Sequence, residues 1–279
     1  MRVIPILAGD IRLRPKALLT PKGQVAGPGT ILRQLREHSA RDWVLPVPVF
    51  LIEHPERGPV LVDTGFAPDV GVSPARTMGR TTPWLFECTP NDLVAVLAGH
   101  GVTSVDTILM THLHTDHISG MGLFPGSEFI ADKVEWAAGR ARGGWLQGYH
   151  RPTIETATRR RELDFTGAEV APLGPFKRTI DVFGDGSVIA CSTPGHAPGH
   201  VSYVIRLGDG EELLLTGDAA YFRSQLDSLE PAGIVRDKVG YASSLAAVAA
   251  YAARDNVSVV TGHDADVWPT LPASYGAAA

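Results

Sequence analysis

Short apolar runs separated by polar turns make up most of the chain, and this pattern predicts a fold rich in β-strands. Residues 47–52 and 59–63 are apolar runs on either side of a polar turn, and they predict a hairpin. Gly-Asp-Gly turns at 184–186 and 208–210 predict two more hairpins in the second half of the chain. Shorter buried strands are expected at 105–110, 129–131 and 257–261.

Helix signals occur between these strands. Thr89 is expected to cap a helix that has Pro90 at its first position and an apolar stripe over residues 93–97. Asp132 is expected to cap a second helix. The Ala-rich residues 241–254 have the apolar spacing of a third helix.

The order of elements is strands followed by helices, and it occurs twice, with the change of halves at about residue 165. This layout suits two sheets packed face to face with helices outside, an αββα sandwich of the α/β (α+β) class. We expect one domain over residues 1–279. Residues 66–88 form a long loop of a kind that is often functional. The polar, Arg-rich residues 143–165 predict a helix with connecting loops.

Composition narrows the classes of protein. The net charge is -5, and a mildly acidic chain lacks the electrostatic footprint of a nucleic-acid binder. There is no run of about 18 apolar residues, and Asp10 and Arg12 interrupt the first apolar run, so neither a membrane span nor a secretory signal is expected. Cys88 and Cys191 form no CxxC pair, so we expect no disulfide framework and a reducing, cytoplasmic compartment.

Four potential metal ligands fall within six residues, directly after a predicted strand. They are His112, His114, Asp116 and His117. Imidazole and carboxylate together suit Zn²⁺, and also Fe, Mn or Co. A solvated polar loop is the alternative, but clustered His and Asp side chains need a partner to offset the loss of hydration. The segment therefore predicts a metal site.

One such segment cannot fill two coordination spheres, and three further ligands are predicted at other strand ends. His196, Asp218 and His263 each follow a predicted strand and a glycine. Glycine permits the close backbone approach that such a turn needs. Four strand ends on one rim of the sandwich are therefore expected to supply seven ligands.

The order His-x-His-x-Asp-His, then His, Asp and His, resembles the metallo-β-lactamase superfamily from Asp63-Thr64-Gly65 to His263. The resemblance implies a binuclear hydrolase in which a metal-bridging hydroxide attacks the substrate, with two divalent ions, zinc by default. The resemblance also implies how the ligands are shared. One ion would be held by His112, His114 and His196, and the other by Asp116, His117 and His263. Asp218 would bridge the two ions. The resemblance further implies that Asp63 orients a ligand histidine.

Within that superfamily, Asp218-Ala219-Ala220-Tyr221 is similar to the N-acyl-homoserine lactonases, the quorum-quenching group. That group has a tyrosine three residues after the bridging aspartate. The similarity implies a lactonase in which Tyr221 donates a hydrogen bond to the substrate carbonyl and Asp116 hands a proton to the departing ring oxygen. A core tyrosine is the alternative for Tyr221.

Other activities of the same fold stay open. A thioesterase or arylesterase, similar to the hydrolytic glyoxalases, is the alternative enzyme, although only 16 residues follow His263 where those enzymes carry an extra helical region. A metal-binding module without turnover is the alternative of a different class. Zinc β-lactamases carry cysteine or serine where Asp218 stands, so β-lactamase activity is not expected.

The substrate is expected to be a small lactone or ester, and its acyl chain would need an apolar groove. The candidate lining residues are Phe66, Met78, Trp84, Phe86 and Trp145, with simple core packing as the alternative for each. We expect no nucleic-acid or membrane partner. The resemblance implies a homodimer built on the N-terminal loops.

Residues flanking the ligands carry weaker signals. Ile118-Ser119-Gly120 departs from the two glycines or Ala-Gly frequent in the family, which is expected to reshape the pocket but leave the metals in place. His200 is expected to be structural. The remaining histidines, His38, His54, His100 and His150, are expected to be solvated.

Overall fold

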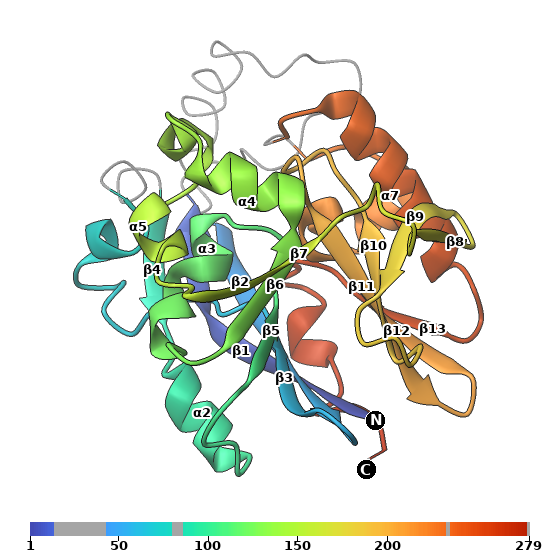
Figure 1. Cartoon of the computed structure of the whole chain (residues 1–279), viewed down its shortest axis with the longest axis horizontal. Helices are drawn as coiled ribbons and strands as arrows, with labels where there is room; N and C mark the ends of the chain where they lie inside the picture. The colour runs from blue at the N-terminus through green and yellow to red at the C-terminus, as the bar shows by residue number, and fades with distance from the viewer. Residues whose placement is uncertain (14–42, 80–85, 233–234, 278–279) are drawn as a thin grey trace.

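Two sheets lie face to face in the computed structural model, with helices on their outer sides (Figure 1). The structure describes residues 1–13, 43–79, 86–232 and 235–277. One sheet has the strand order β14-β1-β2-β3-β5-β6-β7, with β4 also paired to β1, and the other has the order β13-β12-β11-β10-β9-β8. The αββα sandwich predicted from the sequence is therefore confirmed.

The first sheet mixes antiparallel and parallel pairs. Its strands are β1 (Arg2–Leu13), β2 (Trp43–His54), β3 (Gly58–Val62), β4 (Phe86–Pro90), β5 (Thr107–Leu109), β6 (Glu128–Asp132), β7 (Arg159–Leu163) and β14 (Tyr275–Gly276). β2 and β3 form the predicted hairpin, and β5, β6 and β7 continue the sheet in parallel. Parallel strands bring their C-terminal ends to one edge, and the chain continues from β5 into the His112–His117 segment there.

The second sheet contains both hairpins predicted for the second half. Its strands are β8 (Ala171–Leu173), β9 (Phe176–Asp181), β10 (Val188–Ser192), β11 (Val201–Gly208), β12 (Glu211–Leu215) and β13 (Val257–Val260). β9 pairs with β10, and β11 with β12, in antiparallel register. The final strand, β13, runs parallel to β12, so the ends of these two strands lie side by side.

Helices cover the outer face of each sheet. The helices are α2 (Leu93–Gly99), α3 (Thr115–Ile118), α4 (Lys133–Arg140), α5 (Arg151–Ile154), α6 (Ser224–Ser228) and α7 (Lys238–Ala252), with 3-10 turns η1 (Pro74–Arg76), η3 (Ser119–Leu123), η4 (Gly144–Gln147), η5 (Gly217–Ala219) and η6 (Trp268–Thr270). Leu93 of α2 and Trp136 of α4 belong to the apolar cluster of the first sheet. Leu245 and Val248 of α7 belong to that of the second.

A third apolar cluster fills the space between the sheets. Phe50 and Ile52 of β2 belong to it, together with Val188 of β10 and Leu213 of β12. The alternate residue of β2, Leu51, belongs instead to the cluster under the helices. Because both faces of β2 are buried, its sequence is almost continuously apolar rather than alternating.

Two segments differ from the sequence-based prediction. Residues 143–165 contain η4, α5 and an edge strand, β7, whereas a helix with connecting loops was predicted. The Arg-rich sequence of β7 suits a sheet edge, where charged side chains block further pairing. Residues 2–13, for which no element was predicted, form the long strand β1 beside β2.

The cap of α2 also differs from the prediction. Thr89 and Pro90 lie in β4, and the cap is Asp92, whose side chain accepts a hydrogen bond from Ala95 N–H at 3.0 Å. We expect Asp92→Ala to lower the free energy of unfolding by about 1 kcal/mol because this N–H loses its partner. The exposed Thr89 makes the matched control, and Thr89→Ala should stay within about 0.5 kcal/mol of the parent in chemical denaturation. Equal losses in both variants would contradict the assignment of the cap.

The two sheets are also joined at the end where the β2–β3 and β9–β10 turns meet. His54, at the end of β2, is buried, contrary to the solvated position expected for it. Its Nε2 lies 2.9 Å from Ser187 Oγ in the turn between β9 and β10. The ligand-bearing loops follow the opposite ends of the strands.

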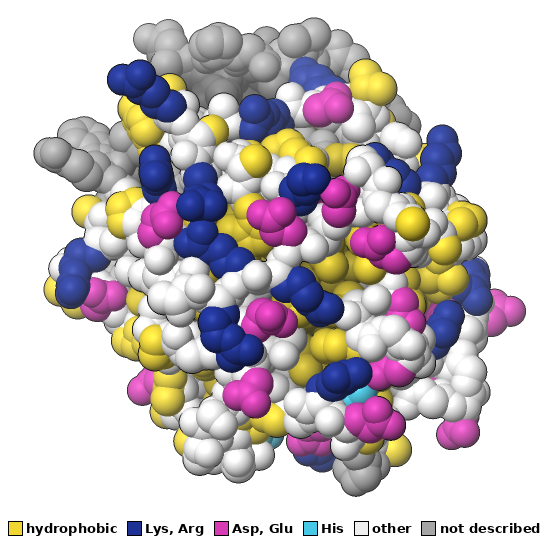
Figure 2. Space-filling model, in the orientation of Figure 1, with side chains coloured by type: hydrophobic (Ala, Val, Ile, Leu, Met, Phe, Trp, Pro, Cys, Tyr) yellow, Lys and Arg dark blue, Asp and Glu magenta, His cyan; other side chains and the backbone are white. Residues whose placement is uncertain are grey.

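The surface supplies two further observations. On the face drawn in Figure 2, Lys and Arg side chains are interspersed with Asp and Glu rather than gathered into one basic patch. Within the described ranges, no helix combines the length and the apolar character that crossing a membrane would require.

Candidate metal centre

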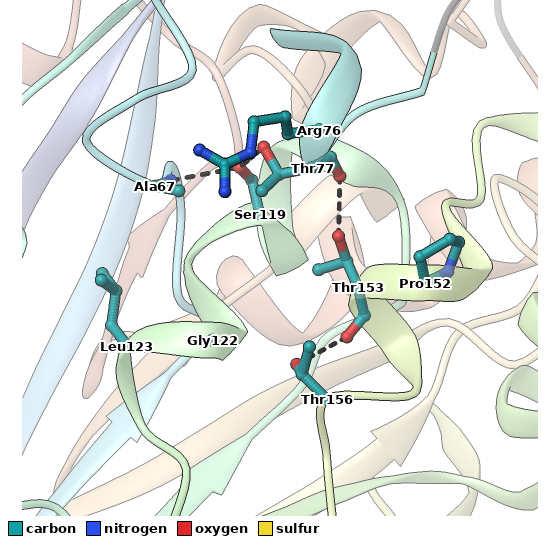
Figure 3. Close-up of a pocket in the computed structure, with 9 residues that line it drawn as sticks. All are labelled: Ala67, Arg76, Thr77, Ser119, Gly122, Leu123, Pro152, Thr153 and Thr156. Atoms are coloured by element: carbon teal, nitrogen blue, oxygen red, sulfur yellow. Dashed lines mark hydrogen bonds between the residues drawn. The ribbon is translucent and has the colours of Figure 1, made fainter. Parts of the chain in front are cut away.

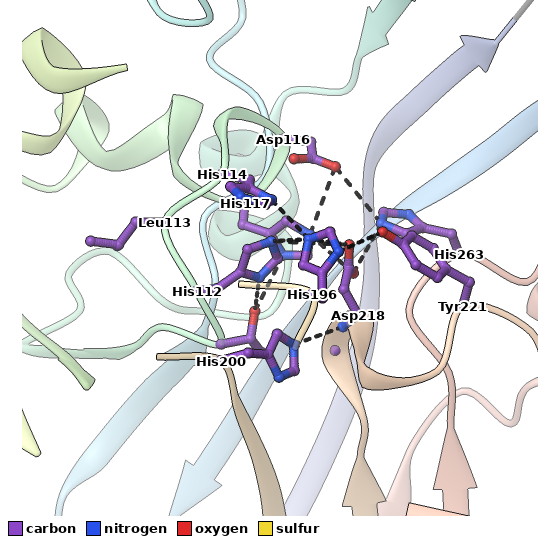
Figure 4. Close-up of polar contacts among 12 residues, drawn as sticks. His112, Leu113, His114, Asp116, His117, His196, His200, Asp218, Tyr221 and His263 are labelled. Carbon is purple, nitrogen blue, oxygen red and sulfur yellow. Dashed lines mark hydrogen bonds and ion pairs between the residues drawn. The ribbon is translucent and has the colours of Figure 1, made fainter. Parts of the chain in front are cut away.

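The seven predicted ligands meet at one end of the sandwich, where loops from both sheets converge (Figure 4). The first four lie between β5 and the end of α3. The other three follow β10, β12 and β13, and they are His196, Asp218 and His263. The strand ends therefore place all seven side chains as the sequence pattern predicted.

Three imidazoles form the first group. His196 Nε2 lies 3.1 Å from His112 Nε2 and 2.8 Å from His114 Nδ1. Leu113, between the two histidines of the first motif, points away from the group in Figure 4. The alternation of the chain thus brings His112 and His114 to one point.

Asp116, His117 and His263 form the second group. Asp116 Oδ2 lies 3.8 Å from His117 Nε2 and 3.7 Å from His263 Nε2. Asp116, with 20% of its side chain exposed, is the more open of the two aspartates in the cluster, because only 3% of Asp218 is exposed. Each group therefore has one partly exposed side chain, His114 in the first and Asp116 in the second.

Asp218 lies between the two groups. Its Oδ2 is 3.3 Å from His196 Nε2, and its Oδ1 is 3.4 Å from His117 Nε2 and 3.2 Å from His263 Nε2. One oxygen faces each group, which is the arrangement that a bridging carboxylate requires.

Burial and charge set opposite protonation preferences in the two groups. Burial lowers the pKa of His114 and of His196 to about 3, so these imidazoles are neutral and can offer a lone pair. Burial also acts to lower the pKa of His117, but the neighbouring carboxylates of Asp63, Asp116 and Asp218 raise it overall. A cation is therefore favoured beside His117, either a proton or a metal ion.

The donor set fits divalent metal ions. Among the described side chains, the buried His117 Nε2 and Asp218 Oδ1 have no hydrogen-bond partner, although buried polar atoms normally have one. In the first group, three ring nitrogens face one another, so their lone pairs need an electrophile at the centre. Imidazole nitrogens with carboxylate oxygens are the usual ligands of Zn²⁺ and similar ions.

Groups outside the cluster fix how the ligand rings point. His117 Nδ1 lies 2.8 Å from Asp63 Oδ2, and His263 Nδ1 lies 2.8 Å from the carbonyl oxygen of Pro46. With the ring proton on Nδ1, both rings donate outward and leave the Nε2 lone pair facing the centre. Asp63 was predicted as such a partner. Pro46 was not, because a backbone carbonyl leaves no signal in a sequence.

His200 is buried and holds the backbone of the aspartate between the groups. Its Nε2 accepts a hydrogen bond from Asp218 N–H at 2.9 Å, and its Nδ1 lies 2.9 Å from Thr193 Oγ1. Gly217 has a φ of +51°, and a Cβ there would lie 2.8 Å from His200 Nε2. The close packing of this turn shows why glycine precedes Asp218.

Tyr221 lies at the edge of the centre (Figure 4). Its hydroxyl oxygen is 2.9 Å from His196 Nδ1, and its ring stacks on His263 with centroids 5.4 Å apart. Its ring also belongs to an apolar core cluster, as the alternative of a core tyrosine implies, and its role toward a substrate carbonyl stays a prediction.

Of the candidate groove residues, the three whose side chains the structure describes, Phe66, Met78 and Trp145, do not form one surface. Phe66 and Met78 are buried in the core cluster that holds Tyr221. Trp145, in η4, is 58% exposed. Shortly after it in the chain, the carbonyl of Gly148 accepts a hydrogen bond from the N–H of Thr115, the residue that follows His114. Trp84 lies outside the described residues, and so does the side chain of Phe86.

A small pocket of about 170 Å³ lies beside η3 and α5 (Figure 3). Ser119 lines it. Its hydroxyl accepts from Ala67 N–H at 3.1 Å and donates to Thr77 Oγ1 at 2.8 Å. Ser119 thus ties the 66–79 loop to the segment after α3.

Comparison with known proteins gives a family and a set of similar chains. The family model described as the metallo-beta-lactamase superfamily matches residues 42–263. An N-acyl homoserine lactonase AttM of Azorhizobium caulinodans is 30% identical over 256 residues, which cover 87% of this chain and 91% of that protein. The N-acyl homoserine lactonase AttM of Agrobacterium fabrum is 31% identical over 248 residues, which cover 84% and 88%.

The fold is also found among solved structures. An N-acyl homoserine lactone hydrolase, with the product N-hexanoyl-L-homoserine bound at its catalytic metal centre, superposes with a TM-score of 0.74. The two chains are 22% identical, and the match covers 97% of this chain and 96% of that one.

Proposed function

The chain belongs to the metallo-β-lactamase superfamily, and from that membership we propose that it is a binuclear metallohydrolase that opens the lactone ring of N-acyl-homoserine lactones. The observation that carries the proposal is a full set of seven ligands with the Tyr221 hydroxyl at its edge. This set lies in a chain that matches lactonases over most of its length.

The ligand groups are assigned as follows in this proposal. His112, His114 and His196 would hold one ion, Asp116, His117 and His263 the other, and Asp218 both. Zinc is the default ion for such ligands, and Fe, Mn or Co are alternatives. When bound, divalent ions act as Lewis acids and lower the pKa of water to about 7.

Tyr221 would act on the substrate carbonyl. For His196 to offer its Nε2 lone pair, its proton must be on Nδ1, which then donates to the Tyr221 oxygen. The hydrogen of the Tyr221 hydroxyl can then be donated to the carbonyl oxygen, where negative charge develops as water adds to the carbon.

Asp116 would serve the leaving group. Addition of water to the lactone carbon is followed by cleavage of the ring C–O bond, and the ring oxygen must gain a proton to leave as an alcohol. Asp116 is the more exposed carboxylate of the cluster and lies beside His117 and His263, so it can carry a proton to that oxygen. One proton of the added water passes through Asp116 to the ring oxygen, which becomes a hydroxyl group, and the second proton is released to solvent as the carboxylate forms.

Tyr221→Phe is expected to lower kcat/KM on a lactone about 10²–10³-fold, the usual effect of losing one donor to an oxyanion. The metal content should stay that of the parent. Tyr251→Phe is the matched control, because the Tyr251 hydroxyl donates to Glu212 at the start of β12, away from the centre. Unchanged turnover in Tyr221→Phe with both ions present would remove the hydroxyl from the mechanism.

The test of the proposed function is a panel of N-acyl-homoserine lactones, thioesters, aryl esters and phosphodiesters, assayed on the metal-loaded protein. Hydrolysis of the lactones with the highest kcat/KM supports the proposal. Faster turnover of thioesters or aryl esters favours the alternative enzyme. Stoichiometric metal without turnover of any substrate favours a binding module.

Three further expectations remain predictions. Trp145, exposed beside the His114 segment, is the candidate that best suits contact with an acyl chain. Cys88 and Cys191 are free and buried, which is compatible with the reducing compartment expected from the sequence. A homodimer built on the N-terminal loops would be tested by light scattering.

A further inference from the structure

Glu135 is a buried acidic side chain that the proposed chemistry does not use. It lies in the first turn of α4 and has no exposed surface. An acidic residue is seldom fully buried unless its oxygens are paired. Its partners therefore indicate what it does.

Both oxygens of Glu135 accept hydrogen bonds from the loops that carry the first group of ligands. Oε1 accepts from Leu113 N–H at 3.0 Å, and Oε2 accepts from Gly199 N–H at 3.0 Å. Leu113 lies between His112 and His114. Gly199 lies three residues after His196, so one carboxyl group joins the ligand loops of the two sheets.

The surroundings of Glu135 are closely packed and hydrogen-bonded. Asp132 caps α4 by accepting from Val134 N–H at 2.5 Å, which fixes the turn that carries Glu135. The hydroxyl of Tyr149 donates to Glu135 Oε1 at 2.9 Å, and its ring lies 5.0 Å from that of His114. A Cβ on Gly199 would lie 2.5 Å from Glu135 N, so the second loop is pressed against the helix.

We propose that Glu135 is the positioning residue of the three-histidine group, which aligns His112 and His114 with His196 for metal binding. The inference rests on the proposed metal centre and not on the identity of the substrate. Partners of this kind, behind the ligands of a metal, typically change metal affinity 10–100-fold when they are replaced. In the other group, Asp63 acts directly on the ring of His117, whereas Glu135 holds the backbone of the loops that carry His112, His114 and His196.

The experiment is a Zn²⁺ titration of the chelator-stripped full chain against a chromophoric competitor, with the ion content confirmed by elemental analysis. Glu135→Gln keeps the shape but places an amide NH₂ either against Gly199 N–H or against Leu113 N–H and the Tyr149 hydroxyl, so donors are left without an acceptor. We expect it to weaken one of the two binding steps 10–100-fold. Asp63→Asn should weaken the other step, and the double variant should weaken both.

Glu212→Gln is the matched control. Glu212 is also a buried carboxylate that accepts from a tyrosine, Tyr251, at 2.8 Å, but it lies at the start of β12, away from the ligand loops. It should lower thermal stability and leave both binding steps at the parent values. A Co²⁺ absorption spectrum, which reports ligand geometry, should change in Glu135→Gln and stay unchanged in Glu212→Gln.

The proposal is overturned if Glu135→Gln binds both ions as the parent does, if Glu212→Gln causes the same loss of affinity, or if Glu135→Gln and Asp63→Asn weaken the same step. If Glu135→Gln does not fold, Tyr149→Phe removes one donor to Glu135 and should weaken the same step by a smaller factor. Parent-like binding in Tyr149→Phe would then count against the proposal. The titration uses no substrate, so its outcome is separate from that of the lactone assays.

Discussion

Asp218→Asn is expected to lower lactone turnover by at least about 10³-fold, because it alters a side chain whose two oxygens face the two ligand groups. Removing a single transition-state donor costs about 10²–10³-fold, and a change of ligand affects the nucleophile as well as the carbonyl. Only one oxygen of the amide could then serve an ion, whereas Oδ1 and Oδ2 of Asp218 lie 3.2 to 3.4 Å from ring nitrogens of the two groups. The measurements are kcat/KM and metal content.

Asp181→Asn provides the control for the loss of a charge in the second sheet. Asp181 accepts backbone hydrogen bonds from Gly184 and Gly186 in the β9–β10 turn, at the end of the sandwich away from the ligands. It should cost stability and leave metal content and kcat/KM near the parent values. Retention of both ions and full activity in Asp218→Asn would refute the role of Asp218 as a bridge.

Removal of the ions with a chelator is expected to abolish hydrolysis and to lower Tm by about 5–15 °C. Ions present at about 100 to 1,000 times their Kd stabilise the folded state by about 2.7–4.1 kcal/mol, and each kcal/mol shifts Tm by about 2–4 °C in a chain of roughly this size. Both effects should reverse when Zn²⁺, Mn²⁺ or Co²⁺ is added back. Differential scanning calorimetry with and without the chelator makes the measurement, and equal Tm values would show that the loops hold their arrangement without metal.

The ligand set was readable from the sequence because each ligand follows a strand and a tight turn. This local pattern is enough to predict the site, because strand ends on one edge of a sheet lie close together in the folded protein. His196, Asp218 and His263 were found in this way. The groups that orient them were harder to find, because their partners are distant in the chain and include backbone atoms such as the Pro46 carbonyl.

Glu135 shows a signal that could have been used. Glu135, Trp136 and Gly139 are the buried residues of α4, so an acidic residue occupies the apolar stripe of a predicted helix. A charged side chain at such a position needs a buried hydrogen-bond partner, so the sequence alone could have predicted that Glu135 makes buried polar contacts. Its actual partners, Leu113 N–H and Gly199 N–H, are 22 and 64 residues away, and only the tertiary structure identifies them.

The strand β1 shows why part of the sheet escaped prediction. Pro5 and Gly9 interrupt its apolar pattern, and a register irregularity between Leu7 and Gly9 accompanies them. Its pairing with β2 on one side and with β4 and β14 on the other makes it a strand despite weak local preference. In the same way, the Arg-rich β7 is a strand because it pairs with β6, although its sequence does not predict one.

The hydrogen bond between His54 and Ser187 has a consequence for how the protein would be degraded. It joins the sheets at one end without any metal, whereas the other end, which Glu135 also joins, would lose part of its connection together with the ions shared by loops from both halves. In a cell starved of metal, fraying would therefore begin at the ligand loops while the hairpin end stayed closed. Proteases would meet those loops first, so the lifetime of the protein would follow the supply of metal.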